Sequence, residues 1–75
     1  MADRTVHGRT PEGHLIVRYD RAGKWFAESE AGTGRRSLNL AAAADLATRA
    51  GGEAYLGRAG GKRFDALVRS RQAHG

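Results

Sequence analysis

The sequence predicts an α+β domain, in which an antiparallel sheet of up to five strands carries one helix on one face. Three observations predict it. Two runs of alternating residues flank a turn near residue 20, an alanine-rich segment with helical periodicity follows an asparagine, and a glycine-punctuated apolar segment closes the chain. At 75 residues the chain accommodates one domain, and the absence of cysteine excludes disulfides and thiolate metal sites.

Residues 1–13 are predicted to form a flexible arm. They are polar, contain the single proline, Pro11, and show a period of neither 2 nor 3.6 residues. We expect residues 14–71 to form the single domain and residues 72–75 a disordered tail.

A hairpin is predicted over residues 15–30, where apolar residues alternate with polar ones. Asp20 and Gly23 bound a turn typical of a three-residue loop, which pairs Asp20 with Lys24 and Tyr19 with Trp25. In this register the helix-covered face carries Leu15, Val17, Tyr19, Trp25 and Ala27. The outer face carries Ile16, Arg18, Lys24, Phe26 and Glu28.

A turn over residues 31–34 leads to a short third strand over residues 35–38. Asn39 then caps a helix over residues 40–50, whose alanine-rich stripe packs closely on the sheet. Asp45 and Arg49 form an i,i+4 pair, and Gly51 ends the helix.

The last segment has two interpretations. As a hairpin with loop 59–61 it places Leu56 opposite Phe64, and we favour this interpretation because Gly60-Gly61 makes a good turn and a poor N-cap. As a helix over residues 62–72 it gathers Phe64, Leu67, Val68 and Arg71 on one side.

No motif indicates catalysis, a metal or a cofactor. Residues 57–63 are similar to a phosphate-binding loop, but Leu56 and Arg63 stand where that motif needs glycine and a hydroxyl. The histidines lack metal-ligand spacing, and Glu28 and Glu30 are typical of solvated charges at a sheet edge. We therefore expect a binding protein and not an enzyme.

The formal net charge of +5 is unevenly distributed. Residues 1–30 carry five basic and five acidic side chains, whereas residues 31–75 carry eight basic and three acidic ones. This asymmetry predicts an anionic partner, although an arginine-rich, lysine-poor composition is also typical of GC-rich genomes. No stretch is apolar enough for a membrane span or a signal peptide, so we expect a cytoplasmic location and no membrane partner. No small-molecule substrate is indicated.

Cations and one aromatic ring are interleaved on the predicted outer sheet face. Such a surface can contact phosphates through its charges and bases through its ring. The residues predicted to bind nucleic acid are Arg18, Lys24, Phe26, Arg35 and Arg36. The alternative function is a homo-oligomeric or protein-interaction module with no role in nucleic-acid binding.

The ordered motifs resemble a family of small bacterial domains of unknown function. The resemblance lies in the Trp25 hairpin, the alanine-rich helix over residues 40–47, and the pattern from Gly51-Gly52-Glu53 to Gly61-Lys62. It implies the element order β-β-β-α-β-β and no activity.

A second resemblance covers residues 18–50. The turn Gly23-Lys24-Trp25 is similar to that of the arm-type DNA-binding domain of phage integrases, which implies a three-stranded sheet that enters a DNA groove. Glu28 and Glu30 depart from the basic second strand of that family.

Overall fold

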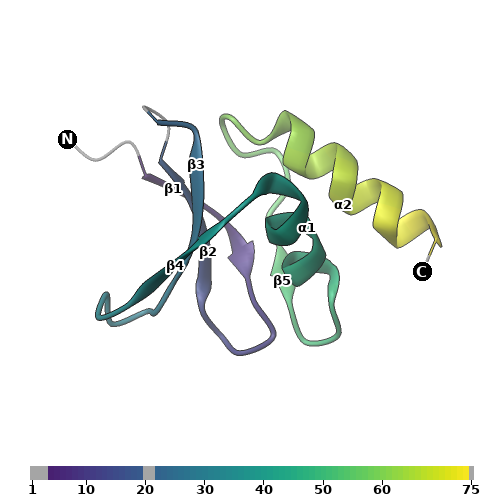
Figure 1. Ribbon diagram of the computed structural model, residues 1–75. Coiled ribbons are helices and arrows are strands. Elements are labelled where there is room, and N and C mark those ends of the chain that lie inside the picture. Colours follow the sequence, from purple (N-terminus) through teal and green to yellow (C-terminus); the bar gives the residue numbers. More distant parts are fainter. Residues whose placement is uncertain (1–3, 20–21, 75) are drawn as a thin grey trace.

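The protein has an α+β fold, as the sequence predicts (Figure 1). The computed structural model describes residues 4–19 and 22–74. Within them, five strands form one antiparallel sheet in the order β4-β3-β2-β1-β5. The elements are β1 (Arg4–Arg9), β2 (Leu15–Tyr19), β3 (Lys24–Glu28), β4 (Arg35–Leu38), α1 (Leu40–Thr48), β5 (Glu53–Ala54) and α2 (Lys62–His74).

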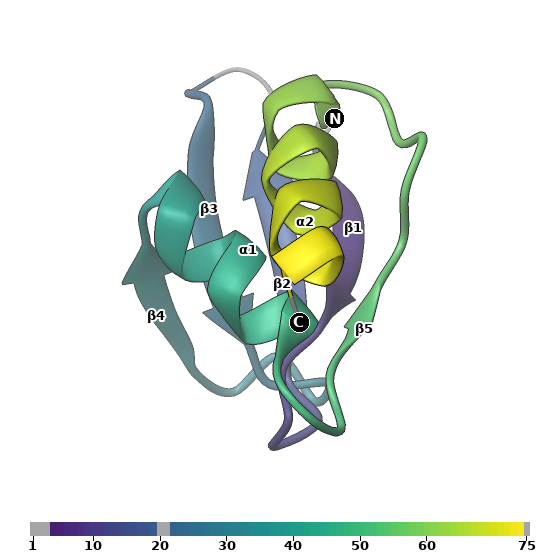
Figure 2. The ribbon, with the colours of Figure 1, turned by 90° about the vertical axis from the view of Figure 1, so that its right-hand side faces the viewer.

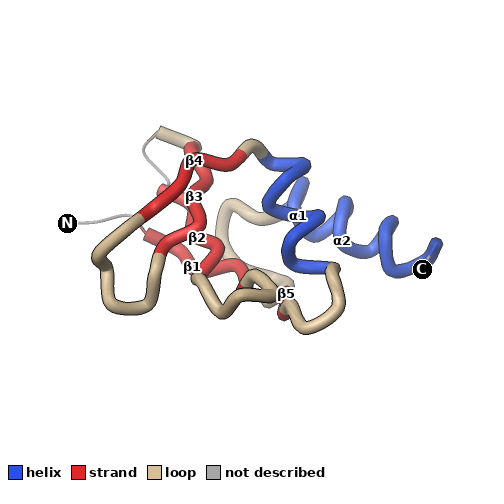
Figure 3. The backbone as a smooth tube through the Cα atoms, turned by 60° about the horizontal axis from the view of Figure 1, so that its bottom comes forward, coloured by secondary structure: helices blue, strands red, loops and turns tan. Residues whose placement is uncertain are grey.

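The molecule has two layers, because both helices pack on the same face of the sheet (Figures 2 and 3). α1 and α2 lie side by side in front of the strands. The core between the layers is made of Ile16, Trp25, Ala43, Ala44, Ala47, Phe64 and Val68. In the described part of the chain, neither helix is long and apolar enough to cross a membrane.

The prediction of a flexible arm over residues 1–13 is wrong for Arg4–Arg9, which form β1 between β2 and β5. A bulge between Val6 and Gly8 interrupts the alternation of side chains by which a strand is recognised in a sequence, so the period of 2 is missing here. His7 and Thr10 are moreover buried although they are polar. The amide of Thr10 donates to the carbonyl of His14, so the segment between them is a hairpin turn.

The predicted hairpin exists, but its register is shifted by one residue. Tyr19 pairs with Lys24 and Arg18 with Trp25, because the carbonyl of Tyr19 accepts from the amides of both Ala22 and Gly23. The loop is therefore longer by one residue, and Asp20, the predicted partner of Lys24, lies outside the described residues.

The shift exchanges the two faces of β2, as a slip of one residue must. Ile16 and Arg18 face the helices, whereas Leu15, Val17 and Tyr19 share the outer face with Phe26. The prediction that Ile16 and Arg18 lie on the outer face is therefore wrong. Trp25 and Ala27 do lie under the helices as predicted.

The first helix, α1, begins at Leu40 after Asn39, as the sequence predicts. The side chain of Asn39 accepts from the amide of Ala42 at 2.7 Å, and Ala43, Ala44 and Ala47 are buried. The small alanine side chains let α1 pack closely on both the sheet and α2.

The C-terminal segment is a helix, so the favoured hairpin prediction is wrong and its alternative is right. Phe64 and Val68 reach the core from one side of α2, and this burial outweighs the missing side-chain cap at Gly61. The helix continues to His74, which also overturns the predicted disordered tail for residues 72–74. Only two residues, Glu53 and Ala54, pair with β1 as the fifth strand.

Candidate functional site

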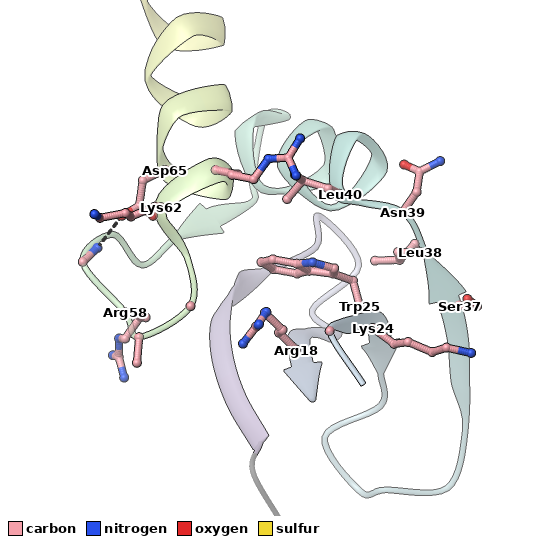
Figure 4. Close-up of a pocket in the computed structure, with 15 residues that line it drawn as sticks. Arg18, Lys24, Trp25, Ser37, Leu38, Asn39, Leu40, Arg58, Lys62 and Asp65 are labelled. Atoms are coloured by element: carbon pink, nitrogen blue, oxygen red, sulfur yellow. Dashed lines mark hydrogen bonds between the residues drawn. The ribbon is translucent and has the colours of Figure 1, made fainter. Parts of the chain in front are cut away.

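A cavity of about 970 Å³ opens between the start of α2 and the region where β3, β4 and α1 meet (Figure 4). Its floor is apolar and consists of Trp25, Leu38 and Leu40. The cationic side chains that line it are Arg18, Lys24, Arg58, Lys62 and Arg63. In Figure 4 the side chains of Arg58 and Lys62 extend away from the Trp25 ring, so their charges stand at the rim.

Trp25 lies at the centre of this arrangement, with Arg18 beside it. Its indole stacks on Phe64 with the ring centroids 5.2 Å apart, and the centroid of the His7 ring lies 4.6 Å from that of the indole. Trp25 retains 7% exposure and lines the cavity. The tryptophan thus belongs both to the core and to the cavity floor.

The loop over residues 57–61 leads directly into α2. The amide of Gly57 donates to Oδ2 of Asp65 at 2.9 Å, and the amide of Gly61 donates to the carbonyl of Arg58 at 3.0 Å. The amides of the first turn lack intrahelical acceptors, as in any α-helix, and Gly61 before the helix has no side chain that could cap them; the acidic residue in this turn is Asp65. The positive end of the helix dipole therefore points towards the side of the cavity that carries Arg58 and Lys62.

Gly60 lets this loop approach the sheet closely. A Cβ atom on Gly60 would lie 2.2 Å from Nη1 of Arg18, so the guanidinium occupies the space that a larger residue would need. Gly60 also has a φ of +77°, which favours glycine. The cavity wall is thus formed by contact between β2 and the glycine loop.

Two groups of cations can be distinguished among the described residues. Among residues 4–19 and 22–74, no carboxylate lies within 4.0 Å of Lys24, Arg58, Lys62 or Arg63. All four are exposed, and the guanidinium of Arg58 lies 5.5 Å from the centre of the Tyr55 ring. The other group is ion-paired and comprises Arg4, Arg9, Arg35, Arg49 and Arg71.

The outer sheet face holds three of the paired arginines. Glu28, which is 8% exposed, accepts from Arg4 at 3.1 Å and from the hydroxyl of Tyr19. Arg35 lies 3.9 Å from the same carboxylate.

A third ion pair on this face joins Arg9 and Glu30 at 2.8 Å. The hydrogen bond from Arg9 lowers the pKa of the Glu30 carboxyl. Carboxylates therefore offset much of the positive charge on the outer face.

The structure does not bring the five predicted binding residues to one surface. Phe26 and Arg35 lie together on the outer face, where the guanidinium stands 4.5 Å from the ring centre. Arg18 lies on the helix-bearing face and lines the cavity. Lys24 lines the cavity but, as the partner of Tyr19, directs its side chain to the outer face, and Arg36 lines a separate hollow of about 400 Å³ with Glu12 and His14.

Sequence reasoning missed Arg58, Lys62 and Arg63. The charge excess after residue 30 and the glycine-rich loop both pointed to this segment. The site could not be recognised from the hairpin interpretation, because these residues lie together beside the cavity only when a helix follows Gly61.

Comparisons with protein-family models, curated proteins and solved structures found no match to this chain.

Proposed function

We propose that this protein binds nucleic acid, and that the rim of the cavity contacts the phosphates. The observation that carries the proposal is the gathering of Arg58, Lys62 and Arg63 around one cavity, with no carboxylate within 4.0 Å of these three charges among the described residues. Such charges attract a polyanion more strongly than ion-paired ones, because no internal partner must first be displaced.

The position of α2 supports the same proposal. Arg58, Lys62 and Arg63 stand at or next to the first turn of this 13-residue helix. A helix N-terminus and neighbouring cations act together on a phosphate group, since both present positive charge and N–H donors. Phosphate contacts of this kind position a nucleic acid without reading its sequence.

The test is a titration with a fluorescent DNA oligonucleotide at several salt concentrations between 50 and 200 mM, a range over which phosphate contacts lose affinity steeply. Arg58→Ala, Lys62→Ala and Arg63→Ala should each weaken binding and each reduce the slope of log K against log salt concentration by about 0.7 to 0.9.

Arg49→Ala is the matched control, because it removes the same charge from an exposed site where Arg49 pairs with Asp45 at 3.1 Å. This variant should leave the salt slope unchanged. Equal losses from the control and the rim variants would show that net charge alone governs binding. The proposal fails if the unaltered protein does not bind at 50 mM salt.

A further inference from the structure

We infer that the cavity accepts one unpaired base of a single-stranded nucleic acid while the rim holds the phosphates of the strand. This inference rests on the proposed function and deepens it. It makes the protein a single-strand binder, and it assigns separate roles to the floor and to the rim of the same cavity.

The shape of the cavity is the first argument. Its volume of about 970 Å³ lies in the range of pockets that enclose small organic ligands, about 300–1,000 Å³. A nucleotide belongs to that size class. A phosphate ion alone needs neither this volume nor an apolar floor.

The chemistry of the lining is the second argument. Leu38, Leu40 and the small part of Trp25 that remains exposed, 7%, offer an apolar surface to a base. Asn39 stands at one side, and because its Oδ1 accepts from the amide of Ala42, its NH2 group remains to donate to a base oxygen or nitrogen. Arg18 lies beside Trp25, and Arg58 and Lys62 lie on the loop side of this floor (Figure 4).

A duplex does not satisfy this arrangement. Its base faces are stacked on one another, and only base edges are accessible in the grooves. A base can reach the floor of a cavity only when it is unstacked, as in a single strand or after flipping. The separation of an apolar floor from a charged rim therefore favours single strands.

The experiment compares four oligonucleotide probes, with thymidine monophosphate as a fifth probe, on the unaltered protein. The oligonucleotides are a 12-nucleotide thymidine DNA strand, its uridine RNA counterpart, a strand of equal length whose bases are replaced by abasic sites, and a duplex of the same length. Trp25 is the single tryptophan, so its emission reports directly on the cavity floor.

The base-bearing strands should bind at least about fivefold more tightly than the abasic strand, which corresponds to the stacking of one base. They should also quench Trp25 emission. The salt slope of natural and abasic strands should be the same, because both carry the same number of phosphates. The duplex should bind more weakly than the single strand and leave the emission unchanged. A difference between the DNA and RNA strands identifies which of them the cavity prefers.

A variant that fills the cavity tests the same inference without removing charge. Ala59→Leu places a larger side chain in the cavity lining, and it should weaken binding of the natural strand to the level of the abasic one. Ala66→Leu, at an exposed position of α2 outside the lining, is the matched control and should bind as the unaltered protein does.

Two results overturn the base pocket and leave phosphate binding intact. One is equal affinity for natural and abasic strands without a change in Trp25 emission, and the other is a duplex that binds as tightly as a single strand. Thymidine monophosphate that binds as tightly as the strand would assign the cavity to a free nucleotide and also overturn the inference. Failure of every probe to bind would overturn the proposed function itself.

Discussion

Trp25 and Phe64 stack with their ring planes inclined by only 18°, and this contact joins the central part of the sheet to the first turn of α2. Phe64 is fully buried and Trp25 almost so. The stack therefore fixes where α2 begins relative to β3, and with it the position of the loop that bears Arg58.

Phe64→Ala should lower the free energy of unfolding by about 3–5 kcal/mol, because it removes a large fully buried side chain from a small core. Urea denaturation followed by Trp25 emission measures this loss, and the emission of the folded variant should shift to the red as the indole gains solvent. Leu56→Ala is the control, since Leu56 is 37% exposed and should change stability little. A loss below about 1 kcal/mol for Phe64→Ala would contradict the stacking of Phe64 in the core.

Gly8 lies where β1 meets β5, and no side chain fits there. A Cβ atom at this position would stand 2.2 Å from the carbonyl oxygen of Glu53, which is a backbone atom that cannot swing aside. Gly8→Ala should therefore separate the two strands and lower the free energy of unfolding by about 1–3 kcal/mol.

Hydrogen exchange at the amide of Tyr55, which bonds to the carbonyl of His7 at 2.8 Å, should accelerate in the Gly8→Ala variant. Gly34→Ala is the control, because a Cβ atom on Gly34 would have nothing within 4 Å of it and the φ of Gly34 is not positive. Similar stability of the two variants would refute the steric argument.

Glu28 holds the outer sheet face together through its contacts with Arg4, Arg35 and Tyr19. Glu28→Gln should lower the free energy of unfolding by about 1–3 kcal/mol, since it weakens charge-assisted bonds at a site that is 8% exposed. Thermal or urea unfolding measures the loss. Glu30→Gln should lower the free energy of unfolding far less than Glu28→Gln does, because the Glu30 side chain is 68% exposed and its pair with Arg9 is screened by water. Equal effects of the two substitutions would show that burial of Glu28 contributes nothing.

Caps, turn residues and helical periodicity in the sequence correctly predicted the elements whose stabilising interactions join residues close together in the chain. The Asn39 cap and the alanine stripe indicated α1 correctly, and Gly23 marked the β2–β3 turn, where its φ is +63°. The order of the middle strands followed from the turns between them.

Elements that depend on distant contacts were not predictable from period and turn residues. β1 buries His7 through a bulge, and the interior that encloses this polar side chain is formed by Trp25 and Phe64 from distant parts of the chain. α2 begins without a side-chain cap and is stabilised by packing on α1 and the sheet. One additional residue in the β2–β3 loop then reversed the faces of β2, which moved Arg18 from the predicted outer surface to the cavity.

The prediction that the outer sheet face contributes to function can be tested separately from the cavity. Arg35 lies over the ring of Phe26 and within 3.9 Å of Glu28, so both its charge and its stacking surface already have partners in the folded protein. If the cavity rim is the interface, the double variant Phe26→Ala/Arg35→Ala should keep the affinity for single-stranded DNA within about twofold and keep the salt slope. An outer-face interface predicts instead a loss of stacking and of one phosphate contact, hence an affinity at least about fivefold lower and a smaller salt slope.

Sedimentation of the unaltered protein and of the double variant tests self-association through the outer sheet face. Phe26 and Tyr19 form a half-buried aromatic pair on this face, which neither helix covers (Figure 2). A shift towards a lighter species in the variant, with unchanged DNA binding, would assign the outer face to a second copy of the chain and leave the cavity as the nucleic-acid site.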